Sequence, residues 1–180
     1  MRLHNDRYEE IKSIVVATFE KYGINKIPID CFELAHKMGI KTIPFSKLSQ
    51  DQLEKIAFCE GEAIMFCINQ QTYIFYNDID NSFTRQRFSI FHEIGHYVLG
   101  HKCESELAKS EADFFARYAI APIPLVWKLG CSGIVEIKDS FDTSFECATN
   151  IKNNYDNWIA YGGQTLKVFE KKLLNLFNLI

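Results

Sequence analysis

The sequence lacks the features that mark a secreted, membrane-spanning or nucleic-acid-binding protein. No apolar stretch approaches the roughly 18–20 residues that a membrane-spanning helix requires. The opening residues MRLHNDRYEE contain no apolar segment of the kind found in secretory signals. Basic residues do not predominate, because 20 Lys and Arg stand against 23 Asp and Glu. We therefore expect a cytoplasmic protein that contacts neither a membrane nor nucleic acid directly.

Paired cysteines, internal repeats and low-complexity segments are also missing. The chain has 180 residues, enough for one domain with a real core, or for one domain with a small appendage. No C-x-x-C pair occurs, so the spacing supports neither a cysteine metal site nor a disulfide framework, and free thiols are expected in a reducing compartment. The cysteines are Cys31, Cys59, Cys67, Cys103, Cys131 and Cys147.

Hydrophobic spacing and capping residues predict mostly helices. Ser49 with Gln52, and Thr143 with Glu146, match the capping-box pattern at helix starts. Helices are expected over residues 5–22, 31–38, 82–99 and 105–120, then as a helix, a turn and a helix after Pro124, and finally beyond a break at Gly162-Gly163.

Three short β-rich runs accompany these helices. Residues 40–45 read as one strand, and residues 63–69 and 72–78 as a hairpin joined by a short polar turn. Separate runs of helices and strands are typical of the α+β class. We expect a mainly helical domain with a small antiparallel sheet over residues 1–124, with a helical extension packed on it over residues 125–180.

The last helix carries an apolar stripe. We expect this stripe to dock in the core, and a partner-binding face is the alternative. The preceding helix-turn-helix-like region is not expected to bind DNA, because residues 125–180 contain six Lys and six Asp or Glu. The stripe consists of Leu166, Phe169, Leu173, Leu176, Phe177 and Ile180.

The stretch FSIFHEIGHYVLGH, residues 88–101, places polar groups where a core helix would have apolar ones. His92, Glu93 and His96 spell H-E-x-x-H, and residues four apart on a helix project from one face. Two neutral imidazoles so placed can bind one zinc ion at about 2.0–2.1 Å. Glu93 is then the expected base toward an activated water. Gly95 is unfavourable in a helix by roughly 0.5–1 kcal/mol, so a neighbouring helix or a substrate backbone should come close there.

A catalytic zinc site needs a third protein ligand, and two residues compete for that position. His101 falls at the tenth position of the motif rather than the eleventh, so we expect it to cap the helix or lie on the surface. Glu111 lies within the apolar stripe of the next helix, where a carboxylate needs a cation. We expect Glu111 to be the ligand. A salt bridge to Arg85, Arg87 or Arg117 is the alternative, and Asp113 is expected to point elsewhere.

The stretch RFSIFHEIGHYVLGH…SEADFFARYAIAP resembles the ImmA/IrrE-type metallopeptidases, which show R-F-x-x-x-H-E-x-G-H followed by E-A-N-x-F-A and a proline. KIPIDCFELAHKMGIKTI is similar to the family's N-terminal element. Asp113 stands where the family usually has Asn. The resemblance covers roughly residues 5–125.

This resemblance implies a zincin-like fold and a gluzincin-like zinc peptidase from bacteria or their mobile elements. His92 and His96 match the histidine ligands, Glu93 the catalytic base and Glu111 the acidic ligand. Such proteins cleave or bind a helix-turn-helix repressor. A regulator that binds zinc but does not cleave is the alternative.

The strand TYIFYND is a candidate edge for an extended substrate, with plain sheet core as the alternative. A tyrosine such as Tyr118 or Tyr97 is a candidate oxyanion stabiliser, and nothing in the sequence chooses among the eight tyrosines.

Overall fold

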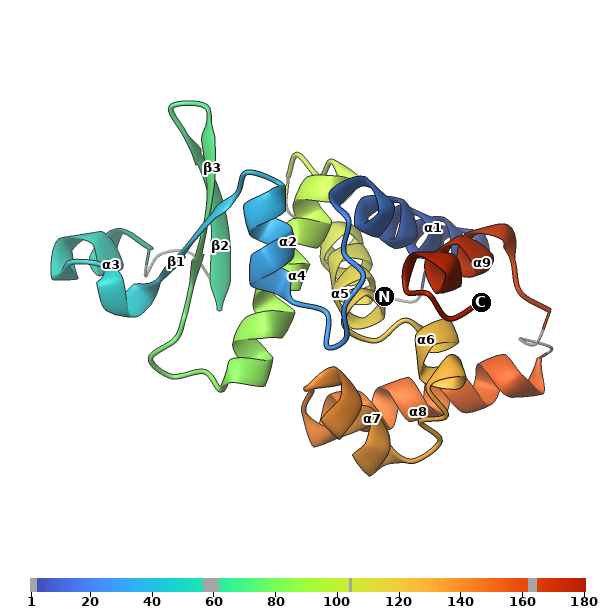
Figure 1. The fold of residues 1–180 in the computed structure, drawn as a ribbon. Helices are drawn as coiled ribbons and strands as arrows, with labels where there is room; N and C mark the ends of the chain where they lie inside the picture. The colour runs from blue at the N-terminus through green and yellow to red at the C-terminus, as the bar shows by residue number, and fades with distance from the viewer. Residues whose placement is uncertain (1–2, 57–61, 104, 162–164) are drawn as a thin grey trace.

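The computed structural model describes residues 3–56, 62–103, 105–161 and 165–180 (Figure 1). Cys59, Glu104 and the Gly162-Gly163 break lie outside this described part. In the described residues no helix is long and apolar enough to cross a membrane. The elements are α1 Asn5–Tyr22, α2 Cys31–Lys37, β1 Lys41–Pro44, the 3-10 turn Phe45–Lys47, α3 Gln50–Ile56, β2 Ala63–Ile68, β3 Gln71–Tyr76, α4 Phe83–Leu99, α5 Glu106–Ile120, α6 Ile123–Lys128, α7 Ile134–Phe141, α8 Phe145–Ala160 and α9 Val168–Leu176.

The helix boundaries follow the capping residues closely. Gly23 ends α1 in the left-handed region, with φ of 60°, and Asp30 accepts hydrogen bonds from the first amides of α2. Ser82 and Ser105 cap α4 and α5 through their hydroxyls. The capping box before α3 is confirmed, because the Ser49 amide donates to the Gln52 side chain at 2.9 Å. Short-range chemistry therefore places the helices that carry the motif.

The α+β class is confirmed, but the sheet is mixed rather than antiparallel. Strand order is β1-β3-β2, with β3 antiparallel to β2 and parallel to β1. The hairpin is confirmed, and its turn residues Asn69 and Gln70 both have positive φ. The chain returns from β1 through α3 and β2 before it reaches β3, and this long connection permits the parallel pairing.

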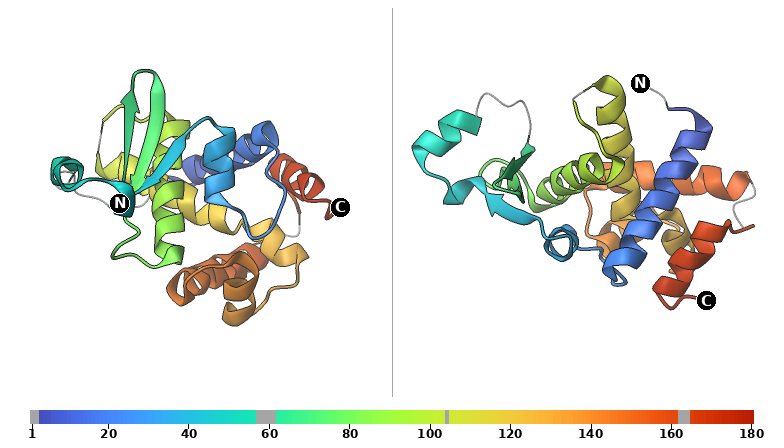
Figure 2. Two further views of the ribbon diagram at one scale, coloured as in Figure 1. Left: turned by 60° about the vertical axis from the view of Figure 1, so that its left-hand side comes forward. Right: turned by 90° about the horizontal axis from the view of Figure 1, so that it is seen from above.

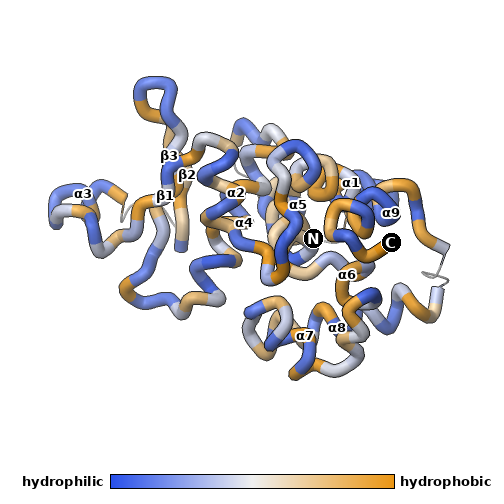
Figure 3. The backbone as a smooth tube through the Cα atoms, in the orientation of Figure 1, coloured by the Kyte–Doolittle hydropathy of each residue, from blue (hydrophilic) through white to orange (hydrophobic). Residues whose placement is uncertain are grey.

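The centre of the domain is the contact between α4 and α5, with hydrophobic segments gathered there and around α6, and a largely hydrophilic α3 at the periphery (Figure 3). Ile90, Phe91 and Ile94 of α4 are fully buried, as is Phe115 of α5. A Cβ built on Gly95 would lie 3.1 Å from the Phe115 Cβ and 3.2 Å from the Ala112 Cα. The expected close neighbour of Gly95 is thus confirmed as α5.

The region after α5 differs from expectation in two respects. Residues 123–128 form the short helix α6, which the sequence pattern does not predict. Proline usually marks the end of a helix, but Pro124 stands in the first turn of α6, where it is tolerated. The capping box of Thr143 and Glu146 is wrong. Ser144 caps α8 through its hydroxyl, whereas the Thr143 amide donates to Lys138 and closes α7.

The last helix packs against the first one, as both views in Figure 2 show. Leu173 and Leu174 are fully buried, Phe177 is nearly so, and its ring meets Phe19 of α1 edge to face. Docking of the apolar stripe is therefore confirmed for its central residues, while Ile180 at its end is 56% exposed. Since Leu173 and Phe177 are covered by the chain itself, they are not available to a partner.

Candidate metal centre

The two motif histidines project from one face of α4 toward a common point. Their Nε2 atoms are 3.0 Å apart. Two nitrogens bound tetrahedrally to one zinc ion at about 2.0–2.1 Å would be roughly 3.4 Å apart. The helical spacing of His92 and His96 thus aims both nitrogens as a zinc site requires, and Glu93 lies half-buried beside them.

Asp113 of α5 holds the first histidine from behind. Its Oδ1 lies 2.9 Å from the His92 Nδ1, so that nitrogen carries the proton and Nε2 keeps its lone pair for a metal. Burial works to raise the pKa of Asp113, but the hydrogen bond from His92 and nearby cationic charge hold that pKa below its usual value. The expectation that Asp113 points elsewhere is wrong. Its family-variant position, two residues after Glu111, was the only sequence signal for this role.

His101 lies behind the second histidine. Its Nδ1 is 3.0 Å from the Nδ1 of His96, and its Nε2 is 3.0 Å from Oε2 of Glu111. Its backbone amide also donates to the His96 carbonyl and helps to end α4. The capping role is confirmed for the backbone, but the side chain is only 12% exposed and is no surface group. It touches the nitrogen of His96 that faces away from His92.

Glu111 is buried as expected, and its cation in this structure is Arg7 of α1. The Arg7 Nε donates to Oε1 at 2.8 Å and its Nη2 donates to Oε2 at 2.5 Å. These bonds are the largest cause of a Glu111 pKa below its usual value, against the opposing effect of burial, and His101 adds to the lowering. None of the three arginines named from the sequence holds this carboxylate, because only tertiary packing brings α1 to α5.

The donor set fits a metal in part. The two imidazole nitrogens converge, and each ring has a partner behind it that fixes its orientation. Both oxygens of Glu111, however, are engaged by Arg7 and His101. Accordingly, no group of three His, Cys, Asp or Glu side chains in the described ranges is arranged to hold a metal ion together. The ligand role of Glu111 stays a prediction.

Two further expectations concerned the strand TYIFYND as a substrate-binding edge and the tyrosines as oxyanion stabilisers. β3 is the central strand of the described sheet, so TYIFYND cannot serve as a free edge, and the alternative of sheet core holds. Tyr97 is 48% exposed, whereas Tyr118 of α5 is buried beside a cavity that α1 and α8 also line, and burial raises the pKa of its phenol. The choice between these two hydroxyls as oxyanion stabiliser stays open.

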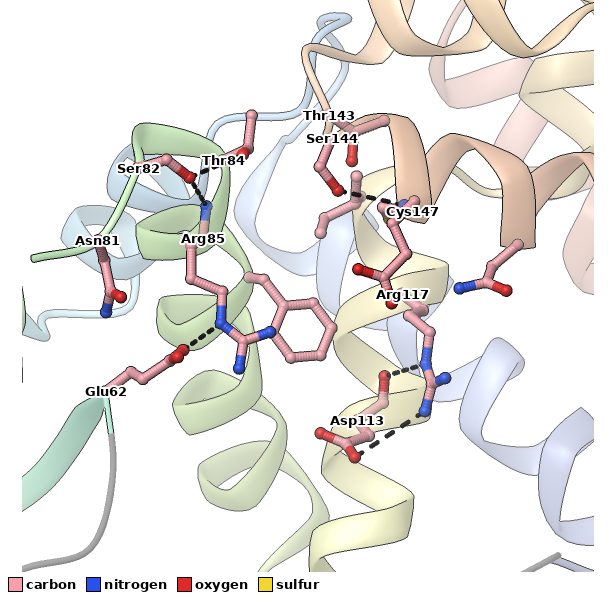
Figure 4. A pocket seen from close by; sticks show the side chains of 14 residues that line it. Glu62, Asn81, Ser82, Thr84, Arg85, Asp113, Arg117, Thr143, Ser144 and Cys147 are labelled. Atoms are coloured by element: carbon pink, nitrogen blue, oxygen red, sulfur yellow. Dashed lines mark hydrogen bonds and ion pairs between the residues drawn. The ribbon is translucent and has the colours of Figure 1, made fainter.

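A cavity of about 540 Å³ adjoins the centre, between α4, α5 and the start of α8 (Figure 4). Figure 4 shows Arg85 paired with Glu62 at one wall and Arg117 hydrogen-bonded to Asp113 at another. Phe88, which lines the cavity, lies 6.4 Å ring to ring from His92. The cavity therefore opens beside the candidate ligands.

Comparison with known proteins gives a family match for part of the chain. The family model Peptidase_M78, described as the IrrE N-terminal-like domain, matches residues 35–121. This range contains the end of α2, the sheet, α4 and α5, and hence all of the candidate centre except Arg7. The chain has no match among curated proteins. The match confirms the resemblance to ImmA/IrrE-type proteins over residues 35–121.

Proposed function

We propose that this protein is a zinc-dependent, site-specific endopeptidase of the cytoplasm, with His92, His96 and Glu111 as zinc ligands and Glu93 as the catalytic base. The observation that carries the proposal is the convergence of the two Nε2 atoms, 3.0 Å apart, with Asp113 and His101 behind their rings. A purely structural site gains nothing from a carboxylate beside the ligands, and this argument favours catalysis.

The chain's own groups have distinct tasks in this scheme. Zinc held by His92, His96 and Glu111 would supply Lewis-acid chemistry toward the scissile carbonyl and the attacking water. Glu93 takes a proton from that water and delivers it to the leaving nitrogen. Asp113 and His101 keep the imidazoles in the tautomers that bind metal. For Glu111 to join the ligands, it has to give up part of its hydrogen bonding to Arg7.

The proposed substrate is a helix-turn-helix transcriptional repressor of a bacterial mobile element or stress regulon. The family match supports a peptidase, and the net charge of −3 fits a protein that acts on the repressor rather than on its DNA. The second candidate is a regulator that binds the repressor without cleaving it. The engagement of Glu111 by both Arg7 and His101 favours this alternative.

Two measurements test the proposal. Elemental analysis of protein purified without chelators should find about one zinc per chain, as expected for a single three-ligand site. Wild type and Glu93→Gln are then co-expressed with a helix-turn-helix repressor encoded beside this chain. Repressor fragments should form with wild type only, because loss of the base lowers the rate by roughly 10²–10⁴-fold.

The control is Glu54→Gln, which changes an exposed glutamate of α3 that lines neither cavity and should leave cleavage in place. Equal cleavage by wild type and Glu93→Gln would refute the mechanism. An intact repressor that nevertheless leaves its DNA in the presence of zinc-loaded protein would establish the non-catalytic regulator instead.

A further inference from the structure

A second cavity, which the proposed chemistry does not use, lies between α8 and the helices α1 and α5. Its volume is about 960 Å³. It shares Asp113, Arg117, Cys147 and Asn150 with the cavity of Figure 4. The two cavities therefore form one groove, which begins at the carboxylate that holds His92 and continues along α8. A polypeptide that is cleaved at the centre needs such a channel for the residues beyond the scissile bond.

One face of α8 presents a row of asparagines to this groove. Asn150, Asn153, Asn154 and Asn157 follow one another at spacings that keep them on one side of the helix. All four are exposed, and all four line the cavity. Within the part of the chain that the structure describes, their side chains make no hydrogen bond. Their amides are thus available to a ligand.

The chemistry of this row suits a polypeptide backbone. Each carboxamide offers an acceptor oxygen and two donor hydrogens at one end, which complements the C=O and N–H groups along the edge of an extended chain. From Asn150 to Asn157 the helix rises about 10.5 Å, the length of about three residues of extended chain. A repeated contact of this kind binds the main chain and leaves side-chain selection to other groups.

Tyr118 supplies an independent sign of a missing ligand. It is 5% exposed and lines the same cavity, and its hydroxyl is buried without a hydrogen-bond partner among the described residues. Buried hydroxyl groups are normally hydrogen-bonded, and each exception calls for a reason. A main-chain carbonyl in the groove would accept this hydrogen bond.

The charges that line the second cavity balance, which favours a polypeptide over a polyanionic ligand. Three cationic residues face three anionic ones there, so a phosphate backbone or an anionic lipid surface would find no net attraction. The aromatic rings of Tyr8 and Trp158 at the wall suit apolar side chains instead. The charged residues are Lys12, Arg117 and Lys167 against Asp6, Glu9 and Asp113.

We propose that the asparagine row of α8, with the Tyr118 hydroxyl, binds an extended segment of the protein substrate through its main chain. The inference rests on the proposed peptidase function and names the part of the molecule that holds the substrate. A disordered or extended linker of the target would fit this groove, whereas a helix has no free backbone groups to offer.

The test measures binding rather than turnover. Glu93→Gln protein is used to select from a phage library of random twelve-residue peptides, and the strongest peptide is synthesised with fluorescein. Fluorescence anisotropy should then show at least tenfold weaker binding by the combined Asn150→Ala, Asn153→Ala and Asn157→Ala variant. The matched control is Asn175→Ala, which removes an exposed asparagine of α9 and should change nothing. Tyr118→Phe should weaken binding several-fold while the circular dichroism spectrum stays the same.

The outcomes separate this inference from the proposed function. Unchanged affinity of the triple variant, or failure to select any peptide, would overturn the groove. The inference would also be overturned if a labelled single-stranded oligonucleotide bound the protein and the triple variant no longer bound it, since the site would then bind nucleic acid. A peptide that binds through the asparagines but resists zinc-loaded wild type would support the groove and refute the peptidase. If the triple variant cleaved the repressor at the wild-type rate, the binding role of the groove would be refuted and the proposed peptidase function would stand.

Discussion

At the scale of single residues, the candidate centre depends on side chains that stand behind the motif histidines. Asp113 and His101 fix the rings of His92 and His96, and neither belongs to H-E-x-x-H. A side chain behind a ligand orients the ring and selects its tautomer, and removal of such a group typically costs 10–100-fold in metal affinity, to order of magnitude about 1–3 kcal/mol. We therefore infer that His101 is a positioning residue rather than a ligand.

His101→Ala should weaken zinc binding by roughly 10–100-fold while the two imidazole ligands stay in place. Competition with a chromogenic chelator measures this change. His36→Ala, which removes an exposed histidine of α2, is the matched control and should leave affinity unchanged. If His101→Ala abolishes binding as fully as His96→Ala does, then His101 is itself a ligand. Unchanged affinity would show that its contact with His96 has no role in the metal site.

At the scale of elements, the centre depends on how closely α4 and α5 approach. Gly95 lets the two helices come within contact of backbone and Cβ atoms, and at this separation Asp113 of α5 reaches His92 of α4. The glycine lowers helix propensity, so the packing it permits has to outweigh that cost. The H-E-x-G-H form of the motif is thus a packing requirement as well as a pattern of ligands.

Gly95→Ala should destabilise the protein despite the better helix propensity of alanine. The gain is about 0.5–1 kcal/mol, while the contact with backbone and Cβ atoms of α5 costs about 1–3 kcal/mol. Urea unfolding should therefore show a net loss of about 1 kcal/mol, the difference between these two effects. Zinc affinity should fall as well, because α5 carries Glu111 and Asp113. A more stable variant would show that α5 moves aside without strain.

At the scale of the whole molecule, the N-terminal and C-terminal helices close one core. Phe19 of α1 meets Phe177, and Arg87 of α4 donates to the carbonyls of Ile29 and Phe141, the latter at the end of α7. The first helix also supplies Arg7 to Glu111. The C-terminal segment therefore packs on α1, the helix whose Arg7 pairs with Glu111.

Leu173→Ala should cost about 2–5 kcal/mol of unfolding free energy, as expected for a fully buried leucine. Thermal or urea unfolding should remain a single transition, because α9 shares its core with α1. Ile180→Ala, at the exposed end of the same stripe, is the control and should change stability by less than about 0.5 kcal/mol. Two separate transitions in the wild type would show that residues 125–180 fold independently of the rest.

Local signals in the sequence determined the helices, the hairpin and the aim of the two histidines. A capping serine, a stop glycine and four-residue spacing act within a few residues, so their consequences are readable without the fold. The structure confirms them at the capping box of Ser49 and Gln52, at the hairpin, and at the pair His92 and His96. The family resemblance, quoted from residues 87–122, is local in the same sense.

Contacts between distant segments were decided by the tertiary structure alone. The pairing of Arg7 with Glu111 joins residues 104 positions apart, and nothing in either neighbourhood specifies the other. The parallel partner of β1, the approach of Asp113 to His92 and the groove along α8 are of the same kind. Each depends on the packing free energy of whole elements, which decides where a helix or strand lies. A short motif contains only a few of the residues that contribute to this free energy, so it cannot specify the contact.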